Sequence, residues 1–196
     1  MRYRFLIDTY ATERLKVLSV WSMFEDGDLT VRPHPTDARG RSFREQMVHQ
    51  VVSENLWFKN MLGIDVGAPP LPSEESRRGF IERYAADSAQ RLDALRSKDD
   101  AWWESETAFF DTRRSRAWIM VRRIAHTSHH RGQQMAMLRM LGRDLHSNYG
   151  PTADTGGLMT NSAPVIYAYE DEAALLAGGA KAPLPGTGGK AATERP

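Results

Sequence analysis

Four long stretches of the chain repeat apolar residues every three or four positions, and the first of them covers residues 3–24. This spacing places the apolar side chains on one face of an amphipathic helix. The face consists of Ile7, Tyr10, Val17, Trp21 and Phe24. Residues 25–41 follow, and their two glycines and two prolines predict a loop.

The second stretch has a distinct start signal at Ser42. Ser42 and Glu45 have the spacing of a capping box, in which the hydroxyl accepts a hydrogen bond from the backbone three residues on and the carboxylate accepts one from the serine backbone. The apolar face then continues past His49 to Leu56, and Gly63 is placed to end the helix. The three prolines in residues 67–72 prevent any continuation.

The third and fourth stretches complete the set of long helices. The third opens near residues 73–75, whose two glutamates suit the positive end of a helix dipole, and breaks at residues 98–100. An aromatic connector leads to the fourth helix, predicted over residues 112–141 with a length of about 40 Å. We find no convincing two-residue alternation of a strand, so the predicted fold class is all-α, a four-helix bundle.

The end of the chain departs from this pattern. We expect residues 1–147 to form the bundle and residues 148–177 to form a C-terminal extension. The extension begins irregularly, and its end contains a possible short helix within residues 168–177 that starts among acidic side chains. Glycine, alanine and proline dominate residues 178–196 without apolar periodicity, which predicts a disordered tail.

Composition and charge narrow the class of protein. The net charge is +1, so no overall field would attract nucleic acid or an anionic membrane. The only support for nucleic-acid binding is a group of arginines whose charge acidic residues cancel elsewhere: Arg113, Arg114, Arg116, Arg122 and Arg123. The chain has no cysteine, which excludes disulfides, a thiolate nucleophile and cysteine-ligated metals. With no membrane-length apolar run and no signal-peptide pattern, we expect a soluble cytoplasmic protein without nucleic-acid or membrane partners.

The candidate chemistry lies in the histidines. His126 and His130 are one turn apart on the fourth helix, about 40° apart around its axis, so both rings can reach one ion. They interrupt a stripe that is apolar at both ends, which favours rings that face the bundle interior. His129 lies about 60° from His126 on the other side and is a poorer partner. His49, in the middle of the second helix, is the candidate third ligand.

Simpler interpretations remain open for these residues. A histidine pair at this spacing can belong to a solvated basic face, and a single inward histidine such as His49 is more often a hydrogen-bonded core residue. His34 and His146 are interpreted as loop residues. The zinc-protease pattern is excluded, because Thr127 stands where that motif requires its catalytic glutamate.

Together these residues resemble the DinB family, the DinB/YfiT-like metal-binding four-helix bundles. The match consists of the upstream His49, the pattern His126-x-x-His129-His130-Arg131-Gly132-Gln133 and residues 148–152, and it covers about residues 1–155. The resemblance implies one divalent metal ion on His49, His126 and His130, with zinc first and nickel or iron as alternatives. It also implies a frequent homodimer, and activities that include thiol-dependent S-transfer and hydrolysis of small molecules.

The leading hypothesis is therefore a metal-dependent enzyme, a transferase or hydrolase, in which the ion activates a thiol or a water molecule. A thiol cosubstrate of low molecular weight would come from outside the protein. The alternative is a metal-binding stress or interaction protein without turnover. Gln50 and Gln133 are candidates to hold the other nitrogens of the rings, and Arg122 and Arg123 are candidates to meet an anionic substrate, although solvent-facing arginines are the simpler interpretation of that pair.

Apolar residues also lie off the histidine stripe of the fourth helix: Trp118, Met120, Ile124, Met135 and Leu138. A bundle core faces one sector of a helix, so we expect some of this surface to pack against a second subunit. Burial by the chain's own extension is the competing explanation.

Overall fold

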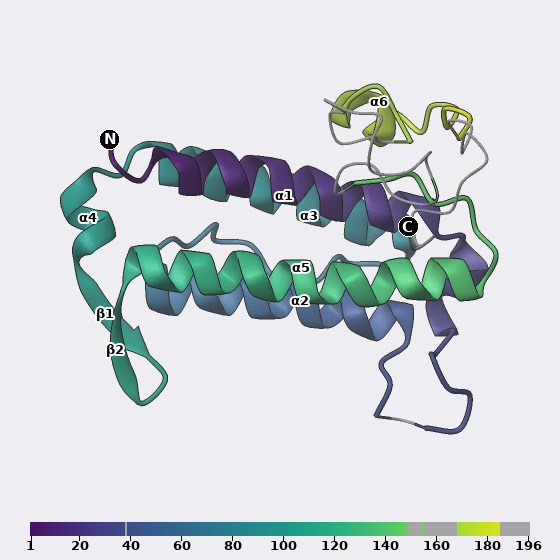
Figure 1. The fold of residues 1–196 in the computed structure, drawn as a ribbon, viewed down its shortest axis with the longest axis horizontal. Coiled ribbons are helices and arrows are strands. Elements are labelled where there is room, and N and C mark those ends of the chain that lie inside the picture. Colours follow the sequence, from purple (N-terminus) through teal and green to yellow (C-terminus); the bar gives the residue numbers. More distant parts are fainter. Residues whose placement is uncertain (38, 149–153, 155–167, 185–196) are drawn as a thin grey trace, which may run out of the picture.

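The computed structural model describes residues 1–37, 39–148, 154 and 168–184. Its four long helices are α1 (Arg4–Met23), α2 (Phe43–Trp57), α3 (Arg77–Arg96) and α5 (Arg116–Met140). They form two layers, with α1 and α3 in one layer and α2 and α5 in the other (Figure 1). The predicted all-α four-helix bundle is confirmed. Since α2 and α3 run in the same direction, the segment between them returns along the length of the bundle (Figure 1).

The ends of α2 follow the sequence signals. The Ser42 hydroxyl accepts from the Glu45 backbone, and the Glu45 carboxylate accepts from the Ser42 backbone at 2.8 Å, so the capping box forms as predicted. The helix continues as a π-helical turn, η2 (Phe58–Leu62), and ends at Gly63 with φ of 68°. A side chain would be strained at that angle, which is why glycine stands there.

The start of α3 lies a few residues later than predicted. Ser76 is the capping residue, and its hydroxyl accepts from the Gly79 backbone at 3.1 Å. The acidic pair Glu74 and Glu75 therefore precedes the helix instead of occupying its first turn. The predicted loop after α1 also contains a short 3₁₀ helix, η1 (Asp26–Thr30), whose Asp28 pairs with Arg143 at 2.8 Å.

The region before α5 corrects the prediction of a helix from residue 112 and of a fold without strands. The aromatic connector contains a short helix, α4 (Asp100–Glu104), and is followed by an antiparallel hairpin of β1 (Glu106–Phe109) and β2 (Thr112–Ser115). Residues 112–115, Thr-Arg-Arg-Ser, carry no apolar helical face to bury. Ser115 then caps α5 by accepting from the Trp118 backbone at 3.2 Å, which fixes where the helix begins.

Two apolar clusters fill the bundle, one toward each end. One packs the second half of α1 against Phe43, Met47 and the end of α5, and the other packs the start of α1 against η2, Trp103 and the start of α5. Buried polar groups lie near the middle of the bundle. Glu54 is at their centre, because it accepts from Tyr10 at 2.7 Å and faces Arg91 at 3.4 Å and Arg123 at 3.7 Å.

The C-terminal part packs on the outside of this bundle. The helix α6 (Glu172–Leu176) lies within the predicted short fifth helix; Leu175 joins an apolar cluster and Glu172 pairs with Arg14. His146 is a loop residue as predicted but is buried, with Nε2 2.8 Å from the Ala182 carbonyl. Most of the predicted irregular segment and residues 185–196 of the predicted disordered tail lie outside the described residues.

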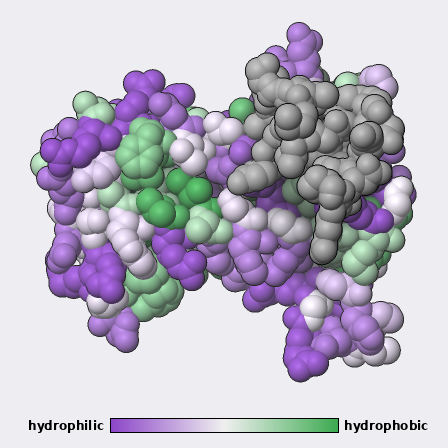
Figure 2. Space-filling view, viewed as in Figure 1, coloured by the Kyte–Doolittle hydropathy of each residue, from purple (hydrophilic) through white to green (hydrophobic). Residues whose placement is uncertain are grey.

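Two properties of the surface complete the fold. On the face seen in Figure 2, apolar side chains gather over the half of the bundle that carries the hairpin and the start of α5. Among the described residues, no helix combines the length and the apolar character needed to cross a bilayer.

Candidate metal centre

Three histidine rings meet where α2 passes α5. His49 comes from α2, and His126 and His130 come from successive turns of α5. The Nε2 atom of His126 lies 3.3 Å from Nε2 of His49 and 3.3 Å from Nε2 of His130. One nitrogen from each ring lies within 4.8 Å of the others. Nitrogens that ligate a tetrahedral ion at about 2.1 Å are about 3.4 Å apart, so this spacing fits a divalent metal ion.

An aromatic side chain holds the central ring in place. Trp57 stacks on His126 with 5.8 Å between ring centroids and an interplanar angle of 26°. The Arg123 guanidinium lies over the Trp57 ring, 5.6 Å from its centroid. Arg123 is itself fixed, because it donates to Ser53 at 3.0 Å and to Thr127 at 3.1 Å. A chain of contacts therefore orients His126 from the interior of the bundle.

The electrostatic setting keeps the rings neutral. Burial, followed by the charge of Arg123 and the neighbouring rings, lowers the pKa of His126 to about 3. Burial and the neighbouring rings lower the pKa of His130 to about 4, and burial and Arg41 lower the pKa of His49. A metal ligates the neutral imidazole, so these rings are ready to bind an ion without first losing a proton at neutral pH.

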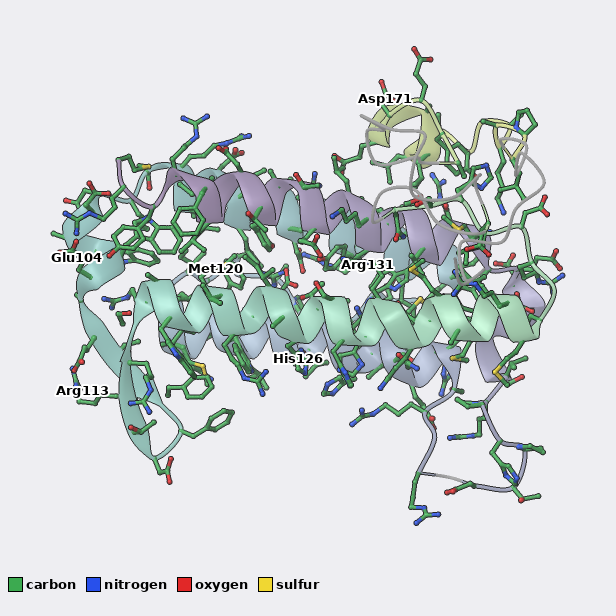
Figure 3. The ribbon with its side chains drawn as sticks, in the orientation of Figure 1. Glu104, Arg113, Met120, His126, Arg131 and Asp171 are labelled. Atoms are coloured by element: carbon green, nitrogen blue, oxygen red, sulfur yellow. The ribbon has the colours of Figure 1, made fainter. Side chains whose placement is uncertain are left out.

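One of the three rings is buried in the bundle, as the stripe suggested, and the other two lie at its edge. His126 points away from α1, whereas Met120 and Arg131 point toward it (Figure 3). His130 is 3% exposed, and His49 and His126 are half-buried. The buried side of α5 includes His130 but not His126, and it consists of Ile119, Met120, Arg123, Thr127, His130, Arg131, Gln134, Met137 and Leu138. His49 therefore lines a surface groove, whereas His130 is buried behind it.

The candidate supporting residues have other partners. The Gln50 amide oxygen accepts from Gln134 at 2.6 Å, and Gln133 lies 2.9 Å from Nε2 of His129. We expected these glutamines to hydrogen-bond the second nitrogen of the histidine rings, but neither does so for His126 or His130. Nδ1 of each of these two rings is buried without a hydrogen-bond partner. Arg122 is exposed. Arg123 is 1% exposed and faces Glu54, so it is neither a surface arginine nor free for an anion.

Two hollows open beside the three rings. One, of about 630 Å³, is lined by His49 itself together with Arg41, Arg44, Val52 and residues around them. The other, of about 350 Å³, is lined by Trp57 and the hairpin residues Ala108 and Phe110. Ser53 and Leu56 line both, so the hollows adjoin along α2. The sequence pattern did not indicate Arg41 or Trp57, although a residue eight positions after His49 can lie on the same broad face of α2.

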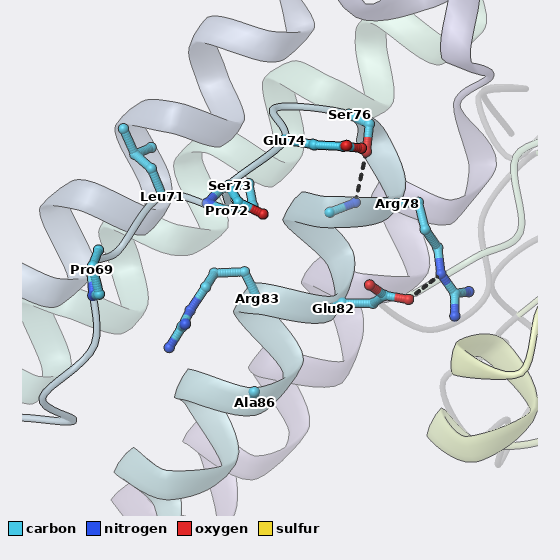
Figure 4. Close-up of a pocket in the computed structure, with 11 residues that line it drawn as sticks. Pro69, Leu71, Pro72, Ser73, Glu74, Ser76, Arg78, Glu82, Arg83 and Ala86 are labelled. Atoms are coloured by element: carbon cyan, nitrogen blue, oxygen red, sulfur yellow. Dashed lines mark hydrogen bonds and ion pairs between the residues drawn. The ribbon is translucent and has the colours of Figure 1, made fainter.

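A larger hollow, of about 700 Å³, lies elsewhere, between α3 and the segment before it (Figure 4). Both of its arginines are paired with a carboxylate: Arg78 donates to Glu82 at 2.6 Å, and Arg83 pairs with Asp87. No histidine lines it. The chemistry of the described residues therefore points to the smaller hollows at the rings.

Comparisons with known proteins identify the family and agree with the fold. The model of the DinB family matches residues 6–156, well over half of the chain. No curated protein matches. Among solved structures, the crystal structure of a DinB-like protein from Bacillus cereus ATCC 10987 is similar, with a TM-score of 0.62 and 18% identity. The match covers 70% of this chain and 91% of that one, and at this identity it supports the fold alone.

Proposed function

This chain belongs to the DinB family, and from that premise we propose that it is a metal-dependent enzyme acting on a small molecule, either a thiol-dependent S-transferase or a hydrolase. His49, His126 and His130 would hold the ion. When bound there, a divalent ion lowers the pKa of a thiol or water and so supplies a nucleophile at neutral pH. Three imidazoles suit zinc first, and nickel or iron as alternatives.

The observation that carries this proposal is the convergence of three Nε2 atoms beside a groove. Nε2 of His126 lies 3.3 Å from Nε2 of each of the other two rings, and His49 lines an open hollow. Three protein ligands leave at least one coordination position for an exchangeable ligand, as catalytic zinc sites do and closed structural sites do not.

The chain's own residues would orient the ligands and limit access. Trp57 covers one face of the His126 ring, and Arg123 holds Trp57 from the inside of the bundle. The described chain has no cysteine, so a thiol nucleophile has to enter as a cosubstrate. The groove lined by His49 provides the path for it.

The alternative is a metal-binding stress or interaction protein without turnover. Such a protein needs no access to the ion, and its site is expected to be sealed. The adjoining hollows on α2 favour the enzyme.

A thiol-consumption screen tests the proposal. Protein loaded separately with zinc, nickel or ferrous iron is mixed with a small thiol and a panel of electrophiles and esters, and loss of thiol or of ester is followed. We expect turnover with at least one metal, and loss of at least a hundredfold in His126→Ala, since the ion supplies several kcal/mol of transition-state stabilisation. Metal-loaded protein that behaves like His126→Ala throughout would favour the non-catalytic alternative.

A further inference from the structure

Arg41 is an exposed cation that lines the same hollow as His49, at the entrance to the proposed metal centre. Within the described part of the chain, its guanidinium makes no ion pair and no hydrogen bond. The other charges that line the same hollow are matched, because Arg44 pairs with Glu75 at 3.6 Å and Glu45 pairs with Arg32 at 2.5 Å. Arg32 does not line the hollow but neutralises Glu45 from beside it, so the charges in and next to the hollow leave one positive charge in excess, that of Arg41.

This charge lies close to the rings. Burial is the main cause of the lowered pKa of His49, and the charge of Arg41 is the next. A divalent ion on three neutral imidazoles would also keep its full double charge, because none of its ligands is an anion. Both contributions have the same sign, so this end of the groove favours a negatively charged group on a ligand.

The opposite end has a different character. Leu56, Trp57, Met61 and Phe110 line the second hollow, with Leu56 49% and Phe110 72% exposed. Phe110 lies in the hairpin turn and meets Trp57 edge to face, with 6.3 Å between ring centroids. Exposed aromatic and aliphatic side chains in a concave site indicate an apolar part of a ligand.

The metal centre lies between these ends. The loop before α2 and the hairpin before α5 project from opposite ends of the bundle, on the side to which His126 points (Figures 1 and 3). His49 and Trp57 are eight residues apart on α2, a distance of about 12 Å along the helix. A single small molecule can therefore reach from the charged hollow, past the ion, to the apolar hollow.

We propose that the substrate of this site is an amphipathic carboxylate, a small molecule whose anionic group is bound by Arg41 and whose apolar part lies against Leu56, Trp57 and Phe110. This inference rests on the proposed function, because it takes the metal centre as the reacting point between the two ends. The groove then selects for charge at one end of the substrate and for apolar surface at the other.

Calorimetric titrations with two probes of equal length test the inference. The zinc-loaded and the metal-free protein are each titrated with 6-phenylhexanoate and with its neutral counterpart 6-phenylhexan-1-ol. We expect the carboxylate to bind more tightly than the alcohol. Arg41→Gln should weaken binding of the carboxylate about fivefold, because a solvent-screened charged contact is lost. The affinity for the alcohol should stay unchanged.

Two further variants control the result. Arg44→Gln removes the same charge from the same hollow, but Arg44 is already paired with Glu75, so its effect should stay below about twofold. Phe110→Asn removes the aromatic ring from a position with φ of 54°, an angle that asparagine tolerates. It should weaken both probes by about three- to tenfold.

The zinc content of each sample separates this inference from the proposed function. Zinc-loaded protein that binds neither probe, or equal losses in Arg41→Gln and Arg44→Gln, would overturn the inference and leave the metal centre standing. Carboxylate binding that requires zinc but is unaffected by Arg41→Gln would also overturn it, since the ion alone would then bind the anion. Protein that takes up no zinc would refute the proposed function, while the metal-free titrations would still test Arg41.

Discussion

At the scale of single residues, the arrangement of the three candidate ligands depends on side chains behind the rings. Trp57 packs on His126, Arg123 holds Trp57, and Glu54 faces Arg123 at 3.7 Å within the bundle. The two charged residues in this series of contacts, Glu54 and Arg123, are each 1% exposed. The three-histidine cluster is therefore connected to the buried polar groups between the two apolar clusters.

Replacement of Glu54 tests that connection. Glu54→Ala leaves Arg91 and Arg123 buried without their shared carboxylate, so we expect the free energy of unfolding to fall by about 3–5 kcal/mol. Glu82→Ala, which breaks the exposed pair with Arg78, is the control and should cost about 0.5 kcal/mol or less. Urea unfolding followed by circular dichroism measures both, and equal effects would refute a structural role of the buried network.

The histidines should also make the stability of the metal-free protein depend on pH. Folded His126 and His130 take up protons near pH 3 and 4, whereas an unfolded imidazole does so near 6.5. Between these values the unfolded chain binds more protons, so the free energy of unfolding is highest above about pH 6.5 and falls progressively as the pH is lowered toward 3.

Thermal melts of chelated protein at pH 7.5 and 5.5 measure this effect. The melting temperature should fall at pH 5.5, and His126→Ala should show a smaller fall, because one depressed group has been removed. An equal fall in both proteins would show that the acid sensitivity arises elsewhere.

At the scale of secondary structure, capping signals predicted more than charge did. The Ser42–Glu45 pair set the start of α2 correctly, since a capping box is a specific pairing of two side chains with two backbone groups. The acidic residues 73–75 placed the start of α3 too early, because a favourable charge near a helix end does not fix the first residue. The hairpin was missed because its strands are four residues each and half exposed, too short for alternation to stand out.

Two serine variants test where α3 begins. Ser76→Ala removes the hydroxyl that accepts from the Gly79 backbone and should lower the free energy of unfolding by about 1 kcal/mol. Ser73→Ala, at the position expected from the sequence, should change it by less than about 0.5 kcal/mol. Chemical denaturation compares them, and a larger effect at Ser73 would return the helix start to the earlier position.

For the histidine site, residue spacing predicted which rings come together better than it predicted how they are oriented. The spacing of one turn between His126 and His130 correctly predicted that their two rings lie together. The third ring, His49, comes from α2, as expected from its position in the second helix. The inward direction that the stripe predicted holds for His130, which is buried, but not for the half-buried His126, because the buried side of α5 also includes Arg131 and Gln134. A side chain such as Trp57, which contacts His126 from another helix, becomes visible only when α2 and α5 are placed together.

At the scale of the whole molecule, we propose that the protein forms a homodimer. Met120 and Leu138, two of the residues that suggested a second subunit, are fully buried within the chain's own clusters. Trp118 remains 42% exposed, and Val121, one turn later on α5, is 52% exposed. Adjacent exposed apolar side chains on a long helix support a homodimer through the start of α5.

Light scattering at micromolar concentration tests this assembly. Two chains of 22.1 kDa give an expected mass of about 44 kDa, and Val121→Lys should shift the protein toward the monomer, because it places a charge in the proposed contact. Phe5→Lys, at a similarly exposed position on α1, should leave the dimer intact. A wild-type mass near that of one chain would exclude the dimer.

The most direct test of the account is the metal content of untagged protein and of four histidine variants after loading and desalting, measured by mass spectrometry of the elements. We expect about one divalent ion per chain in the wild type. His49→Ala, His126→Ala and His130→Ala should each lose most of it. His129→Ala should retain it, because Nε2 of His129 is exposed and faces Gln133. Equal loss in all four variants, or a wild type without metal, would contradict the three-histidine centre.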